Sequence, residues 1–342
     1  MKQSYVIGID ISKLKIDCAV MEATQEVHLE KVVENSDVKI KAFILQVIKA
    51  LKIEKSDLLI CCENTGIYNR PLERVCVSLG VNLWVEHAVK IKRASTDMRG
   101  KNDRKDALRI AEYAIRYQDK VVLYKESSKS IKELNDCLKV RETLSGQRVA
   151  IENQLREAKT HDIECYNVLK KGYAKILKSI SKSLDEIELK IDALIESEDE
   201  IKQNAELMTT IPGIGKQNAV RFIIATNNFH SFNSAKHLAC YAGVVPFQNQ
   251  SGTIIKRDRV SKMANLQLKS LLHLAAMAAI RFDPEMKAYY TRKVKEGKNK
   301  MSVLNAVRNK LVHRIVAVIT QKRPYVVKTE DSIKKESILL AY

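Results

Sequence analysis

The chain has 342 residues, 45% of them hydrophobic, and its 59 lysines and arginines outnumber its 41 aspartates and glutamates. This length allows two or three modules, and a formal charge of +18 favours polyanionic partners such as nucleic acid. No apolar run approaches the ~18 residues of a membrane span, which disfavours a membrane role. Seven cysteines without a C-x-x-C pair speak against a zinc site. With no targeting segment at the first residues, we expect a cytoplasmic, nucleoid-associated protein of a bacterial-type cell.

Residues 1–120 have the pattern of an α/β domain. Three short β-rich runs separated by a few residues predict an antiparallel meander, and an amphipathic helix and an unbroken apolar strand follow. The predicted strands are 5–10, 16–21, 27–33, 58–62 and 81–85, and the predicted helices are 37–51, 70–79 and 102–116. The resulting order β-β-β-α-β-α-β-α is the ribonuclease-H arrangement, also found in RuvC-like domains.

Four carboxylates fall at the ends of these elements. Asp10 ends the first strand, Glu63 ends the strand after the first helix, and Asp103 and Asp106 are i and i+3 on one helical face. Repulsion makes such a cluster costly without a cation. A single aspartate at a strand end is more often a turn or cap residue, but the four together predict a site for Mg²⁺, with Mn²⁺ as the alternative. We expect this site to serve phosphodiester chemistry on nucleic acid.

Residues 121–205 predict a helical coiled-coil segment. Apolar residues in its second half alternate spacings of three and four, at Leu177, Ile180, Leu184, Ile187, Ile191 and Leu194. The pattern breaks around 160–172, which predicts two long helices joined near 161–166. The helices could form an antiparallel pair within one chain or an intermolecular coiled coil, and the sequence leaves both open.

Residues 206–325 predict a mostly α-helical module, followed by a loosely held tail at 326–342. The module opens with a glycine-rich turn at 210–216, which could approach a phosphate as helix-hairpin-helix DNA binders do, or could be a tight helical connection. Helices are predicted at 234–242, 266–281 and 300–320. The predicted nucleic-acid contacts are Gly213, Gly215, Lys216, Lys256, Arg257, Arg259, Lys262, Lys298, Lys300 and Arg308.

With these residues assembled, the chain resembles the DEDD transposases of bacterial insertion sequences, the IS-one-ten family, to which the Piv-type DNA invertases are related. Residues 8–13, 63–66 and 101–107 are similar to the family's RuvC-like motifs. Its C-terminal transposase domain is matched at 211–215, at 241–246 and by Ser251-Gly252. The similarity therefore extends over nearly the whole chain.

The resemblance implies a site-specific recombinase that excises and inserts its own mobile element. The implied partners are DNA, at the element ends and the target, and a structured bridge RNA that pairs with both. In the family a serine of the C-terminal domain attacks the DNA phosphate and forms a covalent intermediate, and Ser251 is the matching position. Recombination requires four strand cuts, so we expect a homodimer or homotetramer.

Two other classes of function remain open from the sequence. A metal-only nuclease of the Holliday-junction resolvase kind would leave Ser251 idle and give free DNA ends without a protein adduct. A non-catalytic nucleic-acid-binding protein could retain the same fold, in which case replacing Asp10 would leave strand transfer unchanged. The four intact carboxylates argue against the second class.

Overall fold

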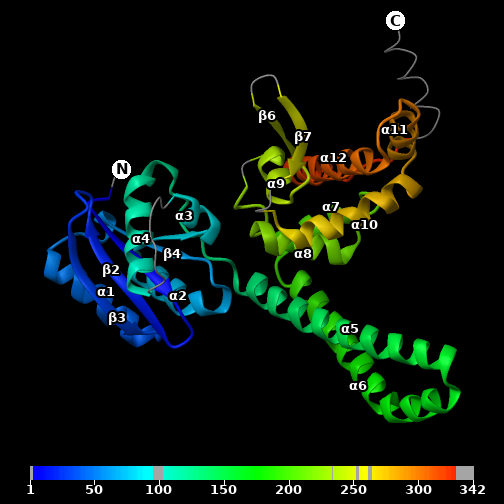
Figure 1. Ribbon diagram of the computed structural model, residues 1–342, viewed down its shortest axis with the longest axis horizontal. Coiled ribbons are helices and arrows are strands. Elements are labelled where there is room, and N and C mark those ends of the chain that lie inside the picture. Colours follow the sequence, from blue (N-terminus) through cyan, green and yellow to red (C-terminus); the bar gives the residue numbers. More distant parts are fainter. Residues whose placement is uncertain (1–2, 95–102, 233, 252–253, 261–263, 329–342) are drawn as a thin grey trace, which may run out of the picture. The chain divides into compact units, whose positions relative to one another are not determined.

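A computed structural model describes residues 3–94, 103–232, 234–251, 254–260 and 264–328, with the backbone alone described at 103, 248–251 and 254–259. The chain divides into two compact units, Met1–Glu126 and Ser127–Tyr342. Figure 1 labels helices and strands of both units. Within the described residues, no helix combines the length and apolar character needed to cross a membrane.

The first unit is built on a five-stranded sheet. Its strands are β1 (Tyr5–Ile11), β2 (Lys15–Glu22), β3 (Val27–Glu34), β4 (Leu58–Glu63) and β5 (Asn82–Glu86), in the order β3-β2-β1-β4-β5 (Figure 1). Strands β1, β2 and β3 form the predicted antiparallel meander, and β4 and β5 run parallel to β1. This topology confirms the predicted ribonuclease-H-like, RuvC-like fold.

Helices cover both faces of this sheet. They are α1 (Asp37–Leu51), α2 (Arg70–Leu79), α3 (Ala88–Ala94) and α4 (Asp103–Arg116), with short 3-10 turns at Lys55–Asp57, Gly66–Asn69 and Gln118–Lys120. Because side chains alternate along a strand, Ile7 and Ile9 of β1 pack into a core with α1 and α2. Val6 points the other way and joins the core beneath α4. The central strands β1 and β4 are therefore buried on both faces, as the apolar run in β4 predicted, whereas β3 is largely exposed.

Helix α4 lies unusually close to β1 at Gly8. A Cβ atom at Gly8 would overlap the carbonyl oxygen of Ala107 and the backbone nitrogen of Ala111. A glycine lacks that atom, so the helix backbone can rest directly on the strand. This contact fixes how near the face of α4 comes to the end of β1.

Replacing Gly8 by alanine is expected to destabilise the first unit by about 1–3 kcal/mol, since the methyl group must push α4 away from the sheet. The sole tryptophan, Trp84, is buried in the core beneath α4 and reports this unit in a urea titration followed by fluorescence. Gly146→Ala is the matched control, because a Cβ there meets nothing within 4 Å and lies in the other unit. An unchanged Trp84 transition in Gly8→Ala would contradict the close packing.

The second unit begins with a long antiparallel helical hairpin of α5 (Lys129–His161) and α6 (Ile163–Glu196). At the open end of the hairpin, the hydroxyl oxygens of Ser130 and Ser197 lie 3.3 Å apart. Near its closed end, the Tyr173 hydroxyl donates to the Gln154 side-chain oxygen at 2.9 Å. The chain turns at Asp162, whose carboxylate accepts two backbone N–H groups and starts α6. The two long helices are therefore as predicted, and they pair within one chain.

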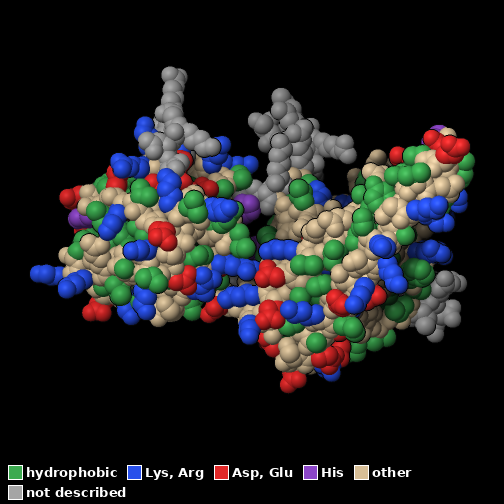
Figure 2. Space-filling model, turned by 90° about the horizontal axis from the view of Figure 1, so that it is seen from below, with side chains coloured by type: hydrophobic (Ala, Val, Ile, Leu, Met, Phe, Trp, Pro, Cys, Tyr) green, Lys and Arg blue, Asp and Glu red, His purple; other side chains and the backbone are tan. Residues whose placement is uncertain are grey.

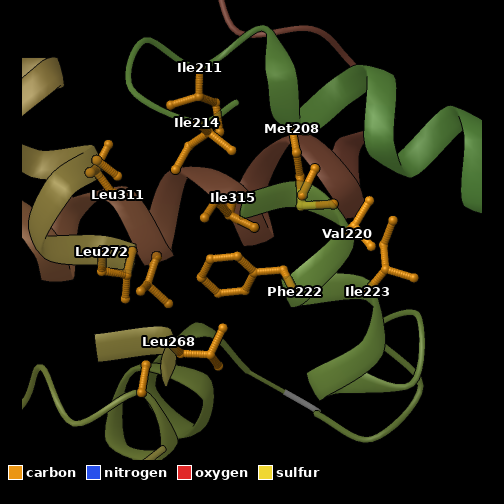
Figure 3. Close-up of a cluster of buried hydrophobic side chains, with 14 of the residues drawn as sticks. Met208, Ile211, Ile214, Val220, Phe222, Ile223, Leu268, Leu272, Leu311 and Ile315 are labelled. Atoms are coloured by element: carbon orange, nitrogen blue, oxygen red, sulfur yellow. The ribbon is translucent and has the colours of Figure 1, made fainter. Parts of the chain in front are cut away.

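The remaining helices pack around one apolar core. They are α7 (Asp199–Thr209), α8 (Lys216–Thr226), α9 (Ala235–Tyr241), α10 (Leu266–Phe282), α11 (Pro284–Lys295) and α12 (Lys300–Gln321). Phe222 of α8 lies among Leu268, Leu272 and Ile315 in this core (Figure 3). The base of the α5–α6 hairpin joins the same cluster through residues such as Leu134. A two-stranded hairpin of β6 (Pro246–Ser251) and β7 (Ile254–Val260) interrupts the helices.

Candidate functional site

Strand pairing brings Asp10 and Glu63 side by side. In the parallel pair of β1 and β4, Ile9 aligns with Cys62, so the next residues along the two strands are Asp10 and Glu63. Ile9 and Cys62 both point into the core with α1 and α2. Asp10 and Glu63 therefore face the opposite side, toward α4. Both predicted carboxylates lie where β1 and β4 end, on the sheet face that α4 covers. We call this place the carboxylate edge.

Asp106 of α4 is close enough to affect the charge state of Glu63. Partial burial raises the pKa of the Glu63 carboxyl, and the negative charge of Asp106 raises it further. Lys92 of α3 acts in the opposite direction and lowers the same pKa. Asp106 itself forms an ion pair with Arg109, one turn further along α4, at 2.6 Å. Three of the four predicted carboxylates are thus gathered at one site.

Asp103 begins α4, one turn before Asp106. The predicted helix over 102–116 is therefore correct to within one residue at its start. The side chain of Asp103 lies outside the described part of the structure. Its place on the face of α4 that carries Asp106 stays a prediction from the i, i+3 spacing.

Three further charged residues lie at this site outside the predicted set; from sequence, Asp17 was interpreted as structural. Asp17 pairs directly with Asp10 across β1 and β2, is 4% exposed, and binds Lys15 at 3.0 Å. Glu86 pairs in register with Glu63 across β4 and β5. Lys92 comes from α3, a helix that was not predicted. Alternation along β2 and β5 indicates that Asp17 and Glu86 lie on one face of each strand. Assigning that face to the α4 side also requires the register between neighbouring strands.

The glycine-rich turn at 210–216 packs against α10. Gly213 has a φ of +92°, and a Cβ there would overlap the carbonyl oxygen of Ala275. Lys216 forms ion pairs with Asp192 and Glu188 of α6. These contacts show that Gly213 is used for packing between helices, and a phosphate contact by Gly213, Gly215 or Lys216 stays a prediction. Gly215 precedes α8 with open space around it.

The predicted nucleophile lies on the β6–β7 hairpin. Ser251 is the last residue of β6, and its backbone pairs with Ile254 of β7. Of its predicted basic neighbours, Lys256, Arg257 and Arg259 lie on β7, with side chains outside the described part, and Lys262 lies outside it altogether. Nothing in the described geometry tests these five assignments.

The other predicted basic residues divide into two groups. Lys298 and Lys300 are exposed where α11 gives way to α12. Arg308 is only 7% exposed and hydrogen-bonds to His273 of α10 and to Asn305. Its density of basic neighbours suggested a surface contact, but α12 turns Arg308 toward the interior. Figure 2 shows lysine and arginine side chains spread over the visible face of each unit.

Two family models match the chain. Residues 7–159 match a DEDD transposase model of the IS110 type, and residues 205–291 match a model described as the transposase IS116/IS110/IS902 family. The first match contains Asp10, Glu63, Asp103 and Asp106, and the second contains Ser251. All five predicted catalytic positions therefore lie inside the matched regions.

Individual relatives agree with these models. The chain is 29% identical over 331 residues to the pilin gene-inverting protein of Moraxella bovis, covering 95% of this chain and 98% of that protein. It is 25% identical over 250 residues to the transposase for insertion sequence element IS1111A of Coxiella burnetii, covering 66% and 68%. A solved structure of Thermus thermophilus RuvC with a Holliday junction substrate matches at a TM-score of 0.29 and 16% identity, covering 36% of this chain and all of that one.

Proposed function

Because this chain belongs to the IS116/IS110/IS902 family of transposases, we propose that it recombines DNA through a serine–phosphate intermediate assisted by a divalent metal. The observation that carries the proposal is the gathering of Asp10, Glu63 and Asp106 at one sheet edge beneath α4. The family assignment supplies the reaction class, DNA recombination. The serine, the metal and the guide RNA are the proposed additions.

The three carboxylates have the chemistry of a Mg²⁺ site. Carboxylate oxygens are the protein ligands that this hard cation prefers. The pKa of Glu63 is raised first by partial burial and then by the negative charge of Asp106, and a bound cation would favour the ionised carboxylate. Asp10, Glu63 and Asp106, with Asp103 one turn earlier, would hold Mg²⁺ or Mn²⁺. When bound, the metal supplies positive charge for activating an attacking oxygen and stabilising a leaving one.

Replacing Glu63 by glutamine is expected to stabilise the metal-free protein and to remove its response to Mg²⁺. Since folding raises the pKa of Glu63, the stability that this carboxyl contributes is fully present below its unfolded pKa and is lost as the pH rises through its folded pKa. At pH 7 the variant should melt about 1–2 °C above the wild type without metal. Below about pH 4 the difference should vanish.

Differential scanning fluorimetry with and without Mg²⁺ measures both effects. Glu54→Gln is a suitable control, because Glu54 is exposed and lies before β4, away from the site. Mg²⁺ should raise the Tm of the wild type and of Glu54→Gln, and leave that of Glu63→Gln unchanged. A Glu63→Gln protein that melts lower than the wild type at pH 7 would contradict the repulsion at this site.

Ser251 is proposed as the nucleophile. Its Oγ forms a bond to the DNA phosphorus while the bond from phosphorus to the leaving DNA oxygen breaks, so the phosphodiester energy is retained in the protein–DNA link. A DNA hydroxyl can then attack the same phosphorus, which restores the DNA strand and releases the serine without ATP. The position of Ser251 inside the matched transposase region supports this role.

The basic composition supports nucleic-acid partners without distinguishing RNA from DNA, and the bridge RNA is proposed from the family resemblance alone. A formal charge of +18 suits a complex with a structured bridge RNA as well as DNA, held in a homodimer or homotetramer. Sequencing the nucleic acid that co-purifies with the full-length protein tests the RNA. A discrete RNA encoded beside the gene for this chain supports guidance, and recovery of only unrelated host RNA contradicts it.

The reaction itself is tested with DNA that carries the junction between one end of the mobile element and the neighbouring host sequence. The purified protein, its co-purified RNA, this DNA and Mg²⁺ should give cut and rejoined strands, and EDTA should stop the reaction. Strands that end freely, with no protein attached, would instead support a metal-only nuclease of the junction-resolving kind.

A further inference from the structure

A buried carboxylate adjoins the proposed metal site without being one of the four predicted ligands. Glu86 ends β5, pairs in register with Glu63, and is 7% exposed. Like Glu63, it points toward α4, since Trp84 two residues earlier is buried in the core beneath that helix. A carboxylate with so little access to water is tolerated only when hydrogen-bond donors and a counter-charge replace the water.

Glu86 has such donors from two helices and from the backbone of the next residue. The Tyr113 hydroxyl of α4 donates at 3.2 Å, and the Lys90 ammonium of α3 lies 3.0 and 3.1 Å from the two carboxylate oxygens. The backbone N–H of His87 donates at 2.7 Å. Burial and the negative charge of Glu86 raise the pKa of Tyr113, so its hydroxyl stays protonated and remains a donor. Both carboxylate oxygens are therefore engaged within the protein.

The two side-chain donors lie on α3 and α4, the helices that also carry Lys92 and Asp106. Tyr113 lies seven residues, about two helical turns, after Asp106 and so on the same side of α4. Lys90 lies two residues before Lys92, whose charge lowers the pKa of Glu63. Glu86 thus ties α3 and α4 to the end of β5, while the contact at Gly8 holds α4 against β1. The helix that carries Asp106 is fixed at two points on the sheet.

We propose that Glu86 is a positioning residue for the metal site. Through Tyr113 and Lys90 it sets the distance of α4 and α3 from the carboxylate edge, and it does not bind the metal because its own oxygens are occupied. This inference rests on the proposed metal site and adds to it a residue that lies outside the four-carboxylate motif. Loss of the Glu86 contacts should weaken metal binding while leaving all four ligands in place.

The test is the affinity of the full-length protein for Mn²⁺ alone, measured by isothermal titration calorimetry. Tyr113→Phe removes one hydrogen bond to Glu86, and Glu86→Gln removes the charge that holds Lys90. Removing such an outer partner of a metal site costs about tenfold or more in affinity, so we expect that loss for Glu86→Gln and a smaller loss for Tyr113→Phe. Neither variant deletes a proposed ligand.

Tyr124→Phe is the matched control. The Tyr124 hydroxyl also donates to a glutamate, Glu73, at 3.2 Å, but Tyr124 packs against the core on the α1–α2 side of the sheet. Tyr124→Phe should lose similar stability and keep the wild-type affinity for Mn²⁺. Equal affinities of Tyr113→Phe, Glu86→Gln and Tyr124→Phe would overturn the positioning role.

Asp106→Asn separates this failure from a failure of the metal site. Wild-type binding that Asp106→Asn abolishes, together with weakened binding in Glu86→Gln, supports both the site and the positioning role. Binding that Asp106→Asn abolishes but Glu86→Gln leaves intact rejects the positioning role alone. Binding that is absent from the wild type, or is unchanged by Asp106→Asn, overturns the metal site and the inference that rests on it.

Discussion

Asp106→Asn is expected to reduce DNA strand cutting by about 10³-fold or more, because it removes one proposed metal ligand and the negative charge beside Glu63. The substitution keeps the size of the side chain, so α4 and its contact with Gly8 should persist. Strand cutting is measured with labelled junction DNA at saturating Mg²⁺, and circular dichroism checks that the fold is retained.

Glu112→Gln provides the control on the same helix. Glu112 is exposed on α4 and lies six residues after Asp106, on a different face. Its neutralisation should leave strand cutting within about twofold of the wild type, within the usual range for a surface change. If Asp106→Asn cuts DNA as fast as Glu112→Gln, the carboxylate edge is not the metal site.

The second large effect is expected from Ser251→Ala. Without its Oγ the chain should form no covalent link to DNA, and rejoined product should fall below detection. The affinity for Mn²⁺ should stay at the wild-type value, because the carboxylates lie in the first unit and Ser251 in the second. Covalent link formation is measured as the DNA-dependent shift of the protein on a denaturing gel.

Ser302→Ala is the control for the serine. Ser302 is exposed in the first turn of α12, and the side chain of Asn299 caps this helix. Its replacement should leave the covalent link unchanged. A full-strength link in Ser251→Ala would move the nucleophile elsewhere and return the metal-only nuclease to consideration.

The first unit could be predicted well because its sequence alternates with the period of its structure. The runs 5–10, 16–21 and 27–33 became β1, β2 and β3, and the apolar run at 58–62 became the central strand β4. Asp10 and Glu63 were predicted because each ends a strand, and Asp106 because it follows Asp103 at i+3 on one helical face. Glu86 escaped notice because a single carboxylate at a strand end has meaning only when the register with Glu63 is known.

The second unit was less predictable for physical reasons. The β6–β7 hairpin is rich in polar and charged residues, so the alternation that marks a strand is hidden in 246–260. The short helices α7, α8 and α11 depend on packing around Phe222 and its neighbours rather than on their own periodicity. Gly213 carried the opposite difficulty, because a glycine used for close packing and a glycine that approaches a phosphate look the same in sequence.

Phosphopeptide mapping of the covalent complex tests the central claim most directly. The full-length protein is incubated with junction DNA and Mg²⁺, denatured, digested with nuclease and protease, and analysed by mass spectrometry. We predict a nucleotide-linked peptide modified at Ser251, present in the wild type and absent from Asp106→Asn. A link at another residue, or cut DNA with no linked peptide at all, would contradict the account.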